Sequence, residues 1–88
     1  MKTHLLNLAE ELDFKTEIQY FDYIVESYIN GQKQQVAKLF EAMLAVDQKE
    51  FLCNYLNKDN PNRYKDKIFN ICIDSVFDYI DYLYKHIN

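Results

Sequence analysis

Three aspartates near the C-terminal end have a spacing that could hold a metal ion. Asp74, Asp78 and Asp81 stand at positions i, i+4 and i+7, so a helix would place their carboxylates on one face. Hard cations such as Mg²⁺ favour oxygen ligands of this kind. Metal sites in helical bundles also use Glu-x-x-His motifs, and this chain has none, because His4 and His86 stand alone near its ends. We therefore expect plain surface charge, with no metal site and no cofactor.

The side chains that could act as nucleophiles lie outside any catalytic motif. Ser27 and Ser75 are the only serines, and neither has the flanking glycines of a nucleophile elbow. A phosphate-binding loop needs several glycines, whereas Gly31 is the only glycine in the chain. The sequence therefore predicts no catalytic residues, no enzyme activity and no small-molecule substrate.

Two cysteines complete the set of reactive side chains. Cys53 and Cys72 lie on apolar helical patterns and lack the spacing of a Cys-x-x-Cys motif. A free cysteine behaves as a small apolar residue and is often buried. We expect two buried free thiols in a reducing compartment.

Composition indicates what kind of fold must carry these residues. The chain has 88 residues, of which 49% are hydrophobic and 27% charged, which suits a single globular domain over 1–88. It has one glycine and one proline, so few positions need a positive φ or break a helix. The sequence predicts an all-α fold, a compact bundle of four to five helices with a long C-terminal helix.

Apolar spacing at i, i+3, i+4 and i+7 sets the expected helix bounds. Capping residues support the starts of the first two helices. Thr3 can cap the first helix, and Thr16 can cap the second, where Gln19 completes a capping box. The helices are expected at 4–12, 17–29, 33–45, 48–56 and from Pro61 to about 86.

Signals between the later helices sharpen these bounds. Gly31 follows the second helix at the place of a left-handed terminating residue. Asp47 with Glu50 is expected to cap the fourth helix, with Val46 and Phe51 as a hydrophobic staple. Asn60 is expected to cap the last helix, with Pro61 at its first position.

The last helix has an unusually broad apolar arc. On a wheel of 100° per residue its polar residues fall in one narrow stripe, formed by Arg63, Lys67, Asn70, Asp74, Asp78, Asp81 and Lys85. A helix that is apolar around most of its circumference is central in a bundle or shared with another molecule. Short neighbouring helices cannot cover such a long helix completely. The alternative is that the rings at its C-terminal end close a monomeric core.

We predict that the C-terminal third of this helix forms a partner-binding surface. Tyrosine suits such surfaces because it buries a large ring and keeps its hydroxyl in water. The predicted partner-binding residues are Asp74, Phe77, Asp78, Asp81, Tyr82 and Tyr84.

Charge narrows the classes of partner. The net charge is −4 and the pI is about 5.0, which disfavours general binding to nucleic-acid phosphates. The middle of the chain, 31–67, is slightly positive, with seven basic and five acidic residues, and both ends are negative. The alternative of DNA binding would use base-reading side chains around the third helix, namely Gln32, Lys33, Gln34, Gln35 and Lys38.

The N-terminal segment MKTHLLNLAEELDFK is too acidic and its apolar run too short for a signal peptide. No stretch reaches the roughly 18 apolar residues of a membrane span. The expected location is a cytoplasm, that of the host if a phage encodes the chain, with no membrane contact.

Two segments carry a resemblance to known proteins. YFDYIVESYINGQKQQVAKLFEAM and the following DQKEFLCNYL are similar to small helical accessory proteins of bacteriophages and mobile elements. The likeness covers roughly 20–57. It implies a compact protein that acts by occupying a larger host or phage protein, and inhibitors of bacterial defence nucleases, the anti-CRISPR type, are one such class.

Together these observations predict a non-enzymatic protein-binding module that masks a larger protein by stoichiometric binding, and that also forms a homodimer or binds as one. Two alternatives stay open. One is a small transcriptional regulator or antitoxin that uses the Lys/Gln surface of the third helix. The other is a structural phage component.

Overall fold

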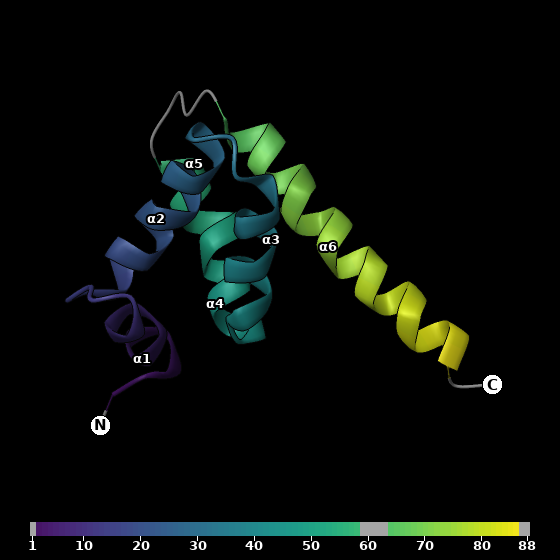
Figure 1. The fold of residues 1–88 in the computed structure, drawn as a ribbon, viewed down its shortest axis with the longest axis horizontal. Helices are drawn as coiled ribbons and strands as arrows, with labels where there is room; N and C mark the ends of the chain where they lie inside the picture. The colour runs from purple at the N-terminus through teal and green to yellow at the C-terminus, as the bar shows by residue number, and fades with distance from the viewer. Residues whose placement is uncertain (1, 59–63, 87–88) are drawn as a thin grey trace.

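The computed structural model describes residues 2–58 and 64–86, without the side chains at 58, 78, 79, 83 and 86, and it is all-α (Figure 1). The predicted fold class is confirmed: within these ranges five helical rods pack together, and the last is the longest. The elements are α1 His4–Glu11, α2 Glu17–Ile29, α3 Lys33–Ala42, α4 Ala45–Glu50, a π-helical turn Phe51–Tyr55, α5 Leu56–Lys58 and α6 Lys65–His86.

Local hydrogen bonds start the first two helices where the sequence predicts. The Thr3 hydroxyl accepts the Leu6 amide at 3.0 Å. At α2 the Thr16 hydroxyl accepts the Gln19 amide, and the Gln19 side chain accepts the Thr16 amide at 2.9 Å. Because this capping box satisfies otherwise unpaired backbone donors, α2 begins at the predicted residue.

The end of α2 also follows the prediction. Gly31 lies just beyond the helix with a φ of 78°, a conformation that costs glycine little. Its amide donates to the carbonyl of Tyr28. The chain then reverses into α3.

The predicted bounds of the third and fourth helices are wrong. Helix α3 ends at Ala42 and not at 45, because Met43 adopts an extended backbone. Helix α4 begins at Ala45, after the extended Leu44. Asp47 and Glu50 are therefore inside the helix and form no capping box, and Val46 is an exposed residue of its first turn and forms no staple. The predicted cap at Asn60 and Pro61 lies outside the described residues.

Helices α4 and α5 form one continuous rod because the π-helical turn between them keeps a helical backbone. Phe51, its first residue, and Leu56, which follows it, both have α-helical dihedral angles. A π-helical turn contains one more residue than an α-helical turn and so changes the direction in which its side chains point. In this arrangement Phe51 is fully buried.

An aromatic cluster forms the centre of the core. The Phe51 ring lies 5.3 Å from that of Phe21 on α2 and 6.3 Å from that of Phe40 on α3. It also stacks on Tyr55 with centroids 5.4 Å apart. The buried apolar residues of this core are Leu5, Ala9, Tyr20, Phe21, Ile24, Val36, Phe40, Met43, Phe51, Leu56, Ile68 and Cys72.

Helix α6 is the element that departs from the rest. Its first half lies beside α3, and its second half runs obliquely away from the body toward the C-terminus (Figure 1). The molecule measures 43 × 34 × 22 Å along its principal axes. No helix in the described part of the chain combines the length and apolar composition of a membrane span.

Candidate interaction surface

The first half of α6 is anchored on α3. Ile68 and Cys72 are fully buried against the core. Ser75, which is also buried, donates its hydroxyl to the carboxylate of Glu41 on α3. Tyr64, just before the helix, packs its ring 5.4 Å from that of Tyr28. These contacts fix the direction of α6 and therefore the position of everything beyond Ser75.

Beyond Val76 the apolar side chains that the structure describes face solvent. Phe77 is 62% exposed, Ile80 51%, Tyr82 57% and Tyr84 74%. The described core ends at Val76. Among the described residues, the second half of α6 therefore presents apolar side chains that the rest of the fold leaves exposed.

The predicted partner-binding residues lie on one helix but on two of its sides. Phe77 and Tyr84 are seven residues apart and so point in nearly the same direction, whereas Tyr82 lies about 140° from Phe77 at 100° per residue. Asp74 and Asp81 are exposed between these sides. The side chain of Asp78 lies outside the described set. One flat partner could not contact Phe77 and Tyr82 equally.

The sequence analysis missed two members of the surface. Phe69 and Ile80 lie on the apolar arc and outside the predicted partner-binding set, yet they are 40% and 51% exposed. Together with Ile73 and Val76 they stand at spacings of four, three and four residues. That spacing is the apolar repeat of a coiled coil, and it is the signal that could have identified them.

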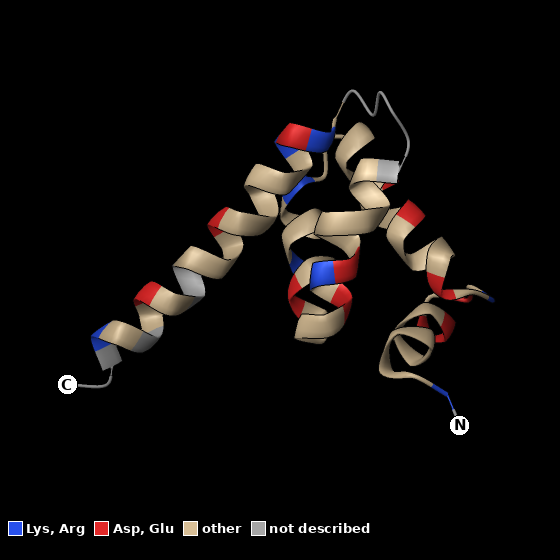
Figure 2. Cartoon of the chain, turned by 180° about the vertical axis from the view of Figure 1, so that it is seen from behind, with Lys and Arg blue, Asp and Glu red and all other residues tan. Residues whose placement is uncertain are grey.

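Charge along α6 changes sign with position. Lys65, Asp66 and Lys67 lie in its first turn, Asp74 and Asp81 follow, and Lys85 lies near the end (Figure 2). Lys85 and Asp81 form an ion pair at 3.1 Å. Because both side chains are well exposed, this pair adds little to stability. The described members of the stripe, Lys67, Asn70, Asp74, Asp81 and Lys85, are exposed to solvent, as predicted.

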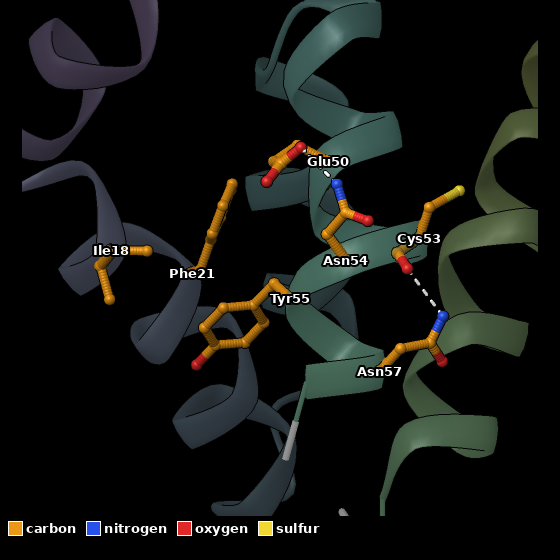
Figure 3. Close-up of a pocket in the computed structure, with 7 residues that line it drawn as sticks. All are labelled: Ile18, Phe21, Glu50, Cys53, Asn54, Tyr55 and Asn57. Atoms are coloured by element: carbon orange, nitrogen blue, oxygen red, sulfur yellow. Dashed lines mark hydrogen bonds between the residues drawn. The ribbon is translucent and has the colours of Figure 1, made fainter. Parts of the chain in front are cut away.

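A second concave region lies between α2 and the rod of α4 and α5. Ile18, Phe21 and Tyr55 form its apolar part (Figure 3). Its amides are already engaged, since Asn54 donates to Glu50 at 2.7 Å and Asn57 donates to the Cys53 carbonyl at 2.7 Å. Its polar groups thus bond to one another and do not converge on a common ligand position.

The predicted burial of both cysteines is wrong for Cys53. Cys53 is exposed at the edge of this concave region, whereas Cys72, on α6, is fully buried against the core. Burial raises the pKa of the Cys72 thiol to about 12. The two thiols therefore differ in reactivity.

Acidic residues meet where α1, α2 and α4 begin. Burial raises the pKa of Asp47, and the carboxylates of Glu17 and Glu50 raise it further. The interaction of Asp47 with His4 lowers its pKa and so opposes this shift. His4 places its Nε2 3.0 Å from the carbonyl oxygen of Ala42, so its ring is used to hold the end of α3. Across the described residues no group of three or more His, Cys, Asp or Glu side chains could hold a metal ion.

The Lys/Gln surface around α3, on which the DNA-binding alternative depends, is only partly open to solvent because one of its side chains bonds to another helix. The Gln35 amide donates to the Tyr23 hydroxyl at 2.5 Å. Helix α3 also packs against both α2 and α6, so two of its sides are covered. Gln32, Lys33, Gln34 and Lys38 are exposed.

Comparison with known proteins adds no relative. A scan against models of protein families, a search of curated proteins and a search of solved structures each found no match to this chain. The functional argument therefore starts from the exposed surface of α6.

Proposed function

We propose that this chain is a non-enzymatic protein-binding module that masks a larger protein by stoichiometric binding. The single observation that carries the proposal is the exposure of Phe77, Ile80, Tyr82 and Tyr84 on a helix half that projects from the body. Phe77, Ile80 and Tyr84 fall on one side of the helix, and a large contiguous apolar patch on a soluble protein usually marks an interaction site. Aromatic residues are also enriched in the buried centres of protein interfaces.

The net negative charge of the chain favours a basic surface on that partner. Asp74 and Asp81 are exposed beside the rings, and the chain as a whole has a net charge of −4. Complementary charge speeds encounter and fixes orientation more than it adds affinity. We therefore expect added salt to weaken the complex.

The resemblance to accessory proteins of phages and mobile elements supports a narrower version. In that version the partner is a bacterial defence nuclease in the host cytoplasm, and the chain is an inhibitor of the anti-CRISPR type. A nuclease must present a basic channel to its nucleic acid, and the net charge of −4 of this chain suits such a channel. The DNA-binding regulator or antitoxin and the structural phage component remain predictions that no feature of the surface favours.

Affinity capture from a bacterial lysate tests the proposal when wild type is compared with a Tyr82→Asp, Tyr84→Asp double variant. Wild type should retain a protein in stoichiometric amount, and the double variant should retain at least about tenfold less, because interface tyrosines often contribute 2 kcal/mol or more each. Circular dichroism should show unchanged helicity, since both residues are more than half exposed.

A matched control places the same charges elsewhere. Ile18→Asp with Val46→Asp changes two exposed apolar residues on α2 and α4, and this variant should capture the partner as wild type does. About 0.5 M salt should release the partner without loss of helicity. Equal capture by wild type and the tyrosine variant would overturn the proposal, as would the absence of any wild-type-specific protein.

A further inference from the structure

We draw no further inference here: the strongest candidate, the concave region between α2 and the rod of α4 and α5 that Ile18, Phe21 and Tyr55 line beside the π-helical turn, carries none, because its amides already bond to Glu50 and to the Cys53 carbonyl and nothing in the structure shows what would occupy it.

Discussion

Cys53 and Cys72 occupy similar apolar patterns in the sequence but different surroundings in the fold. Cys72 lies on the face of α6 that packs against the core, and burial raises the pKa of its thiol to about 12. Cys53 lies on the outer side of the α4–α5 rod. The thiolate is the reactive form of cysteine, so burial and the raised pKa both protect Cys72.

We predict that a thiol reagent such as Ellman's reagent modifies one cysteine of the native protein quickly and the second only after unfolding. Cys53→Ser should abolish the fast reaction and leave the slow one. Fast modification of two thiols in native wild type would contradict the burial of Cys72.

At the scale of single residues the exposed rings also differ from the buried ones in their neighbours. Phe21, Phe40 and Phe51 contact one another from three elements. Phe77 and Tyr84 lie beyond the last described core residue, Val76. The residue types are the same, so composition alone could not separate core rings from surface rings.

At the scale of elements, the end of α3 is the clearest case of tertiary control. Its last carbonyls accept hydrogen bonds from other parts of the chain. The Tyr20 hydroxyl donates to Leu39 at 2.7 Å, the Gln48 amide donates to Phe40 at 3.0 Å, and the His4 ring lies 3.0 Å from the Ala42 oxygen. These partners meet the orphan carbonyls of a helix C-terminus, so the helix can stop before its apolar stripe does.

Tyr20→Phe should lower the free energy of unfolding by about 1 kcal/mol at pH 7, the usual net contribution of one hydrogen bond. Burial, and then the charge of Glu11, raises the pKa of Tyr20 from 10.0 to about 12. The folded state therefore keeps a proton that the unfolded state releases, and this contribution to stability is lost as the pH rises from 10 to 12.

Urea unfolding of wild type and Tyr20→Phe at pH 7 and at about pH 11 measures both effects. The variant lacks the ionisable hydroxyl, so the difference in free energy of unfolding between wild type and variant should be smaller at the higher pH. A gap that stays constant would mean that Tyr20 ionises alike in both states. Tyr84→Phe, at an exposed ring, is the matched control and should change little.

At the scale of the whole molecule, the described core and the projecting half of α6 are separable. Every buried side chain in the described set lies at or before Ser75. The second half of α6 leaves the body in Figure 1 and contributes exposed apolar side chains. The fold therefore has a part that supplies stability and a part that offers a surface.

We predict that a chain ending at Val76 keeps its cooperative thermal unfolding but captures no partner. It loses the exposed Phe77, Ile80, Tyr82 and Tyr84 and keeps the buried anchors Ile68, Cys72 and Ser75. Circular dichroism melts and affinity capture check this. A chain ending at Lys67 lacks those anchors and should unfold. Loss of cooperative unfolding in the Val76 chain would show that the distal half belongs to the core.

The sequence by itself determined the helical class, the starts of α1 and α2, the left-handed Gly31 and the polar stripe of α6. These depend on interactions within a few residues, namely capping hydrogen bonds, glycine's freedom at positive φ and the 3.6-residue period. The tertiary structure alone decided where α3 ends, which cysteine is buried and which part of the apolar arc stays open. Those outcomes depend on side chains distant in sequence, such as Tyr20 reaching Leu39 and α3 covering only the first half of α6, and no local pattern records them.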